Sequence, residues 1–360
     1  MNGAGLLAVL VAAFVPAVVW AFRALPREEW QILACVPRGK NASGSWRGLN
    51  LTFYGFFTAN AYLLAAAVFL MLMGAAGVPA PASLALIALL LGICVPASRL
   101  IARHVDRTKS GFTVGGASFA GLLAAPGAIL AVDALSSGPE GSHIPMMPAL
   151  AAAAIAYVCG EGAGRLACIS FGCCYGKPLT EAGPWASRLF RRFHFVFQGD
   201  NKKIAYASGL QGVRVVPVQA LSVVLLSALG IASAALFFHA RYTAAFLLTV
   251  VVSQAWRAYS ETLRADYRGE GKISVYQTMA LMALPLAAGM AAWIPGSSHV
   301  TADVAAGLAV LWHPGVLLSL QAIWFASFLY TGSSETTASV LSLHVTPGFR
   351  TRRATPSGRV

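Results

Sequence analysis

Apolar runs long enough to cross a membrane recur along the whole 360-residue chain, and they constrain its fold more than any other feature. A spanning helix needs about 20 mostly apolar residues, because backbone amides in lipid must bond within the segment. With 57% hydrophobic and 11% charged residues, an ordinary soluble domain is excluded. We predict an all-α polytopic integral membrane protein with about nine transmembrane helices. They lie near residues 4–22, 52–73, 83–98, 112–132, 148–163, 217–239, 243–259, 275–293 and 304–331.

Three details of the sequence qualify this topology. The first run begins with "MNGAG", which has no charged residue ahead of the apolar stretch, so we interpret it as a retained helix. The fifth run is short and the ninth is broken at His313-Pro314, so either can be re-entrant. Residues 332–360 are rich in Ser, Thr and Arg, and we predict a disordered basic tail there.

Membrane topology explains the net charge of +13 better than a nucleic-acid partner does. Five alternate segments share one side of a nine-helix chain and hold 25 of the 26 basic residues, which leaves only Arg241 opposite. The positive-inside rule places that side in the cytoplasm and the N-terminus outside. Alternatively, arginines on one face bind anionic lipid headgroups. The five segments are residues 23–51, 99–111, 164–216, 257–274 and 332–360.

The stretch "GRLACISFGCCYGKP" places an arginine and three cysteines at the end of an apolar run. Arg165 is costly near membrane depth unless it faces a polar cavity, so it is a functional candidate, with a snorkelling arginine as the alternative. The spacing of Cys168, Cys173 and Cys174 lacks the two separated pairs of a structural zinc site, so we predict no metal. A nucleophilic or redox thiol and simple packing both remain open.

A second charged stretch is "WRAYSETLRADYRGEGKISVYQ". Arg257, Glu261 and Arg264 are spaced at i, i+4 and i+7, so one helical face carries two guanidinium groups with a carboxylate between them. That geometry suits a phosphate held by both arginines and oriented by the glutamate. The alternative is an interfacial helix whose charges face water.

These stretches, taken in order with three others, resemble the prolipoprotein diacylglyceryl transferase family. The matching elements are "FYGF", "GGASFAG", "GRLACISFGCCYGKP", "VPVQA" and "RAYSETLRADYRG" followed by "SVYQ". The resemblance covers roughly residues 49–293, and its specificity lies in the colinear set. It implies a membrane enzyme that moves a diacylglyceryl group from phosphatidylglycerol to a lipobox cysteine thiol, without a metal or another cofactor.

The resemblance also assigns roles to individual residues. Arg165, Arg257 and Arg264 would contact the headgroup phosphate of an anionic glycerophospholipid donor, and Glu261 would orient the arginines. Tyr54 would bond to the glycerol. A thiol of the "GCCYG" stretch, Cys173 for example, would lie near the reacting carbon. Two further positions match the family's substrate-binding elements, namely Gly164 and Gln219.

The chain departs from the family pattern at chemically important positions. Ala120 stands where the family has a histidine thought to act as base, and Cys168 and Cys173 stand where it has an asparagine and a glutamate. The acceptor is therefore open: a lipoprotein precursor, or another thiol or nucleophile. A different class of function is a non-catalytic phospholipid-binding or lipid-moving protein that kept the headgroup pocket.

We predict a multi-pass protein of the cell inner (plasma) membrane with four parts. An extra helix and loop occupy residues 1–48, and the transferase-like core occupies 49–293, with an extramembrane subdomain at 177–216. Residues 294–331 form an extra helix, followed by the tail. The added first helix, together with the basic asymmetry, would turn the core so that its site faces the cytoplasm.

Overall fold

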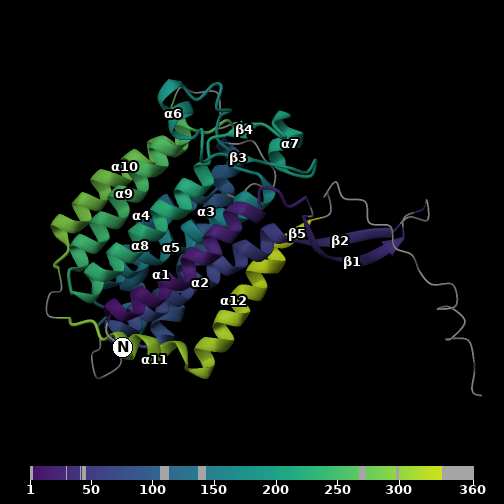
Figure 1. The fold of residues 1–360 in the computed structure, drawn as a ribbon. Coiled ribbons are helices and arrows are strands. Elements are labelled where there is room, and N and C mark those ends of the chain that lie inside the picture. The colour runs from purple at the N-terminus through teal and green to yellow at the C-terminus, as the bar shows by residue number, and fades with distance from the viewer. Residues whose placement is uncertain are drawn as a thin grey trace, which may run out of the picture.

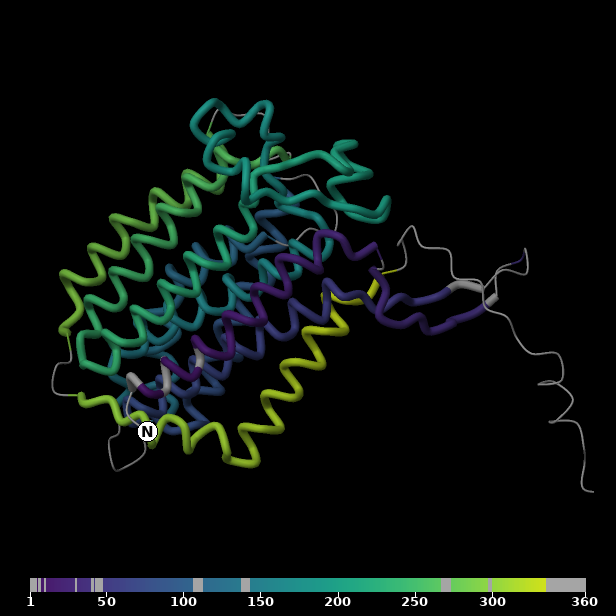
Figure 2. Tube along the Cα trace, viewed as in Figure 1, coloured from purple at the N-terminus to yellow at the C-terminus, as the bar shows by residue number. Residues whose placement is uncertain are grey.

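The computed structural model describes residues 3–29, 31–40, 42, 46–105, 113–136, 143–266, 273–296 and 300–334. Long helices lie side by side in a bundle, with small elements gathered at one end (Figures 1 and 2). The long helices are α1 (Gly3–Ala24), α2 (Phe53–Ala75), α3 (Ala80–Val105), α4 (Val114–Ser136), α5 (Met146–Phe171), α8 (Val218–Phe238), α9 (Tyr242–Thr262), α10 (Val275–Trp293) and α12 (Pro314–Gly332).

The described helices confirm an all-α polytopic membrane protein. Seven of them, α2, α3, α4, α5, α8, α10 and α12, are long and apolar enough to cross a membrane. Helices α1 and α9 also form where apolar runs predicted them, but neither is among those seven. In α9 the apolar run is interrupted by the polar residues Ser253, Gln254 and Arg257, of which Ser253 and Gln254 are buried inside the bundle.

Helix α5 is the packing centre, because it contacts α2, α8 and α9. Small residues permit these close approaches: a Cβ on Gly160 would lie 2.8 Å from Ala65 of α2, and one on Gly162 would lie 3.3 Å from Leu226 of α8. The predicted fifth run was placed at 148–163 and judged short, but α5 has 26 residues and is not re-entrant by length. The last two turns of α5 contain polar residues, so a search for continuous apolar residues ended the helix too early.

The predicted break in the ninth run is confirmed. Helix α11 (Val304–Leu311) ends two residues before α12 begins, and His313 caps α12 by accepting a hydrogen bond from the Gly315 amide at 3.2 Å. Figure 1 shows α11 crossing the end of the bundle at an angle to α12. The tail predicted for 332–360 lies outside the described residues from 335 onward.

The segment between α1 and α2, expected to be a loop, contains a β-hairpin. Strands β1 (Ile32–Lys40) and β2 (Trp46–Thr52) pair antiparallel, and β2 also pairs with the two-residue strand β5 (Ser333–Ser334) after α12. The hairpin projects away from the bundle (Figure 1). Its pairing ties the start of α2 to the end of α12.

Residues 172–217 form a small head at one end of the bundle (Figure 1). It contains the one-turn helices α6 (Pro184–Leu189) and α7 (Lys203–Ser208) and the strand pair β3 (Phe195–Val196) and β4 (Arg214–Val215). Buried aromatic residues of the head, Tyr175, Phe195 and Phe197, share a core with α1 and α8. The head is therefore anchored to the bundle.

The basic segments meet at this same end of the bundle. Lys202 of the head donates a hydrogen bond to the carbonyl of Leu25, Gly176 pairs with Arg264, and the Arg99 guanidinium lies 4.8 Å from the centre of an α12 aromatic ring. Basic residues from several segments of the described chain therefore lie at this end of the bundle.

Candidate active site

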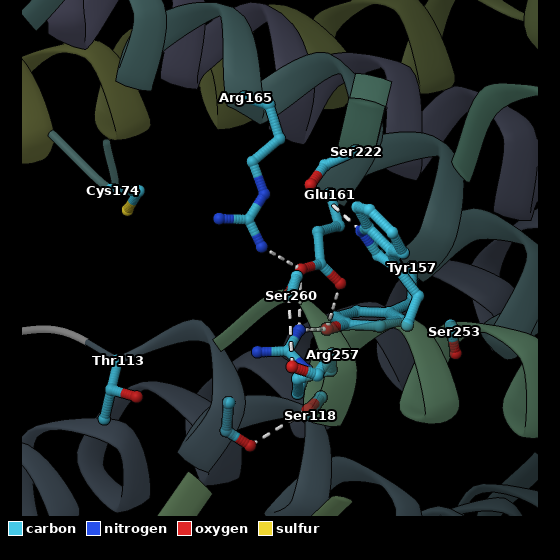
Figure 3. Close-up of polar contacts among 12 residues, drawn as sticks. Thr113, Ser118, Tyr157, Glu161, Arg165, Cys174, Ser222, Ser253, Arg257 and Ser260 are labelled. Carbon is cyan, nitrogen blue, oxygen red and sulfur yellow. Dashed lines mark hydrogen bonds and ion pairs between the residues drawn. The ribbon is translucent and has the colours of Figure 1, made fainter. Parts of the chain in front are cut away.

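A buried carboxylate, Glu161 in α5, binds two guanidinium groups. Its Oε1 accepts hydrogen bonds from Arg165 Nη2 at 2.5 Å and from Arg257 Nη2 at 2.7 Å. Its Oε2 accepts one from the Tyr157 hydroxyl at 2.5 Å, and that hydroxyl also contacts Arg257. Figure 3 shows both guanidinium groups converging on this carboxylate.

The helical repeat explains why these residues meet. Tyr157, Glu161 and Arg165 are spaced four residues apart, so they share one face of α5, and that face packs against α9, which supplies Arg257. Exposure of the side chains is only 6% for Glu161, 15% for Arg165 and 11% for Arg257. Charges this deeply buried require partners, which the cluster partly supplies.

The cluster leaves positive charge and donors available. Two guanidinium groups and one carboxylate give a net charge of about +1. Within the described part of the chain, Arg165 Nε and Arg257 Nε are buried and lack a hydrogen-bond partner. An unpartnered buried N–H is costly, so the arrangement is completed when an anionic acceptor enters.

A third arginine lies beside the cysteine loop. Arg264 binds Asp266 through Nε and Nη2, both at 2.7 Å. Its backbone pairs with Gly176, since Lys177 N donates to the Leu263 carbonyl at 2.9 Å. Burial raises the pKa of Asp266 to about 6, although the neighbouring guanidinium opposes the shift.

The cysteine loop begins where α5 ends. Gly172 is in the left-handed conformation, with φ of 67°, and caps α5, so the chain turns back on itself. Gln219 Nε2, from the "VPVQA" element at the start of α8, donates to the carbonyl of Cys173 at 2.8 Å. Cys174 is also left-handed, with φ of 54°, which is uncommon for a residue other than glycine.

This turn brings three sulfur atoms together. The Sγ atoms of Cys168, Cys173 and Cys174 all lie within 4.8 Å of one another. Hydrogen bonds from the other two thiols, assisted by Arg264 and Arg165, hold the pKa of Cys174 well below its ordinary value, although burial opposes this. In Figure 3 the Arg165 guanidinium has Glu161 on one side and Cys174 on the other.

The remaining motif residues surround the arginines and the thiols. Tyr54 starts α2, packs edge-to-face on Phe171 with ring centres 5.7 Å apart, and lies within electrostatic reach of all three thiols. A Cβ on Gly115 of "GGASFAG" would lie 3.2 Å from Arg257 Nη1, so this glycine makes room for the guanidinium. Gly164 faces Ala61 of α2, where a Cβ would make an ordinary contact at 3.6 Å.

The structure brings together residues from all the predicted motifs but changes one contact. Glu261 was expected to orient the arginines. Instead, Glu161 bridges Arg165 and Arg257, and Glu261 accepts a hydrogen bond from the Ser274 hydroxyl at the start of α10 at 2.6 Å. Arg257 and Glu261 do lie four residues apart in α9, but the carboxylate that accepts a hydrogen bond from Arg257 is on the facing helix α5.

Sequence reasoning missed Glu161, Tyr157 and Asp266. The signal for Glu161 was its position four residues before Arg165, an (i, i+4) acid–base pair inside an otherwise apolar run. Asp266 follows Arg264 by two residues, which is a spacing that no helical rule selects.

Comparison with known protein families identifies the family to which the chain belongs. Residues 44–293 match the family of prolipoprotein diacylglyceryl transferases. The chain belongs to this family. A search of curated individual proteins gives no match. Membership makes the protein a multi-pass membrane transferase of the kind that serves lipoprotein biosynthesis, and the match includes every residue of the arginine cluster and the cysteine loop.

Proposed function

We propose that the protein transfers the diacylglyceryl group of phosphatidylglycerol, or of a similar anionic glycerophospholipid, to an acceptor thiol. The observation that carries the proposal is the Arg165–Glu161–Arg257 cluster, whose excess positive charge and unpartnered buried N–H groups suit a phosphodiester. A neutral headgroup would leave that charge uncompensated.

The roles follow from placement. Arg165 and Arg257 bind the phosphate, and Glu161 fixes their orientation. Arg264, which binds Asp266 through Nε and Nη2 and lies beside the cysteine loop, adds a third contact. As the glyceryl C–O bond breaks, negative charge grows on the departing glycerol phosphate, and the same guanidinium groups stabilise it more strongly than in the ground state.

The residues named from the sequence keep proposed roles. Tyr54 donates to the glycerol, and Gln219 supports the site by holding the Cys173 carbonyl, not by touching the lipid. Gly164 lies at the contact between α5 and α2. Glu261 acts indirectly, through the Ser274 cap of α10.

We also propose a division of the chain. Residues 49–293 form the transferase core in the inner membrane, with 177–216 outside the lipid, whereas 1–48 and 294–331 are additions. Support comes from the packing of α1 on α8 and of α11 and α12 on α2, by which both additions contact core helices.

The test is transfer by the purified protein in vesicles containing phosphatidylglycerol. The acceptor is a peptide with one lipobox cysteine, and mass spectrometry detects the added diacylglyceryl group. Arg165→Gln and Arg257→Gln should each lower the rate by about ten- to a hundredfold, the worth of one charge-assisted hydrogen bond at the phosphate. Arg188→Gln, on the exposed surface of α6, is the matched control and should leave the rate unchanged.

Two results would change the conclusion. Equal rates for the Arg165, Arg257 and Arg188 variants would remove the phosphate role of the cluster. No transfer by the wild-type protein, with phosphatidylglycerol still co-purifying, would favour the non-catalytic lipid-binding function, for which Ala120 in place of the family histidine is the supporting observation.

A further inference from the structure

The three clustered cysteines have the dimensions of a metal centre. The Cys168 and Cys174 sulfur atoms are 3.8 Å apart, and all three sulfur atoms lie within 4.8 Å of one another. Thiolates that bind one tetrahedral ion at about 2.3 Å are about 3.8 Å apart. One pair therefore already has the required separation, and the third sulfur must move by about 1 Å or less.

The backbone holds these sulfur atoms in place without an ion. The amides of Gly172 and Cys173 both donate to the carbonyl of Cys168, which closes the turn after α5. Buried Gln219 fixes the carbonyl of Cys173, and Cys174 adopts the left-handed conformation, which is unfavourable for a residue with a Cβ. Such strain is retained where surrounding structure demands it, and often at functional sites.

The surroundings suit a thiolate centre electrostatically. Three thiolates and a divalent ion carry a net charge of about −1. Arg165 and Arg264 both lie within electrostatic reach of Cys174 and oppose that charge. A purely packing role for the cysteines does not require cationic neighbours.

Although the cysteine spacing predicted no metal, the geometry points to a binding site for a thiophilic divalent cation of the zinc class, formed by Cys168, Cys173 and Cys174. Sulfur ligands without imidazole or carboxylate select soft or borderline ions over magnesium and calcium. Three protein ligands are the composition of a catalytic zinc site, in which the fourth position is left to water or substrate.

This inference rests on the proposed function in one respect: the fourth ligand is the acceptor thiol. Coordination of the acceptor thiol releases its proton to water and leaves a metal-bound thiolate. The reaction then needs no general base at the position where the family has a histidine and this chain has Ala120. The sulfur lone pair then forms the S–C bond to the glyceryl carbon. The C–O bond to phosphate breaks, and glycerol phosphate departs with the bonding electrons beside Arg165.

The binding test uses Zn²⁺ alone and needs no activity. Purified, reduced protein is dialysed against Zn²⁺, and bound metal is measured by elemental analysis. We expect one ion per chain. Single serine variants of Cys168, Cys173 and Cys174 should bind about a hundredfold or more weakly, since even outer-shell changes cost up to about a hundredfold. The matched control has serine in place of the other three cysteines, Cys35, Cys94 and Cys159, and should bind Zn²⁺ like the wild type.

Co²⁺ tests the fourth position. A peptide with one cysteine should shift the sulfur-to-cobalt absorption of the loaded protein, whereas the same peptide with serine should not. Gel filtration and thermal midpoints of the variants separate loss of ligand from loss of fold. Wild-type protein that binds no stoichiometric Zn²⁺ when its thiols are reduced, or single variants that bind it unchanged, would overturn the site.

The two proposals fail separately. Zn²⁺ binding with no phosphatidylglycerol-dependent transfer would refute the proposed function and leave the metal site intact. Transfer that persists in chelator-treated, metal-free protein would refute the role of the ion in thiol activation and leave the function intact.

Discussion

Replacing Glu161 by glutamine removes one negative charge from the arginine cluster and changes the shape of the side chain very little. In the wild type this carboxylate accepts hydrogen bonds from Arg165, Arg257 and Tyr157, with nitrogen-to-oxygen distances of 2.5 Å for Arg165 and 2.7 Å for Arg257. In the variant, two buried guanidinium groups share a neutral amide, and the net charge of the cluster rises from about +1 to about +2.

The expected loss of stability follows from burial. Removing one partner of a buried ion pair costs about 3–5 kcal/mol, and the retained amide oxygen of glutamine puts this variant near the lower value. For a chain of this size that corresponds to a thermal midpoint about 5–10 °C lower in detergent. A lipid phosphate then supplies the missing negative charge, so phosphatidylglycerol should raise the midpoint of the variant more than that of the wild type.

The assay is thermal unfolding in detergent with and without added phosphatidylglycerol, compared with a neutral lipid. Glu181→Gln, an exposed acid of the head, is the matched control and should shift the midpoint by less than about 1 °C. The reasoning fails if Glu161→Gln unfolds at the wild-type midpoint, or if the two lipids stabilise the variant equally.

Three further outcomes are expected. Burial lowers the pKa of Lys202 from 10.5 to about 8, so between pH 8 and 10.5 the unfolded chain binds more protons than the folded protein. The free energy of unfolding should therefore rise by about 3 kcal/mol as the pH rises through this range. In thermal unfolding, Lys202→Met should flatten the dependence of stability on pH. Gly176→Ala should lower the thermal midpoint by the equivalent of about 1–3 kcal/mol because its Cβ would run into a neighbouring backbone carbonyl, whereas Gly127→Ala, with nothing within 4 Å, should not; equal midpoints would contradict the packing. Asp266 has a pKa of about 6, so below pH 6 its carboxyl becomes neutral and no longer competes with the lipid phosphate for Arg264; phosphatidylglycerol should then bind more tightly. Asp266→Asn should bind the lipid tightly at all pH values. If lipid binding by this variant depends on pH as in the wild type, a group other than Asp266 causes the dependence.

Much of the fold follows from local pattern. Each predicted apolar run contains a helix, because a spanning segment must satisfy its own backbone whatever its neighbours do. The ends were less predictable. Helix α5 continues to Phe171 through Glu161 and Arg165, which an apolar count excludes, because these charges neutralise each other on a face turned into the bundle. The β1–β2 hairpin was missed because "PRGKNASGS" is polar and rich in glycine and serine, a composition that is typical of a loop.

The site divides in the same way. Arg165, Arg257 and the cysteine loop were identified from the order of short motifs, which is a property of the sequence alone. The partners of these residues were not identified, because two acids are candidates for Arg257: Glu261 lies four residues away in the same helix, and Glu161 lies in a helix that is distant in sequence. Only the packing of α9 on α5 decides between them, and it selects Glu161.

Hydropathy and motif order depend on residues near one another in the chain, so the amino-acid sequence alone identifies a helical membrane protein of a transferase family. Tertiary structure decided which charges pair and which thiols meet. Cys168 and Cys174 approach only because Gly172 reverses the chain and Gln219 holds it, and Gln219 comes from a different helix. Contacts of this kind join segments that no local rule relates, so they become visible only once the helices pack.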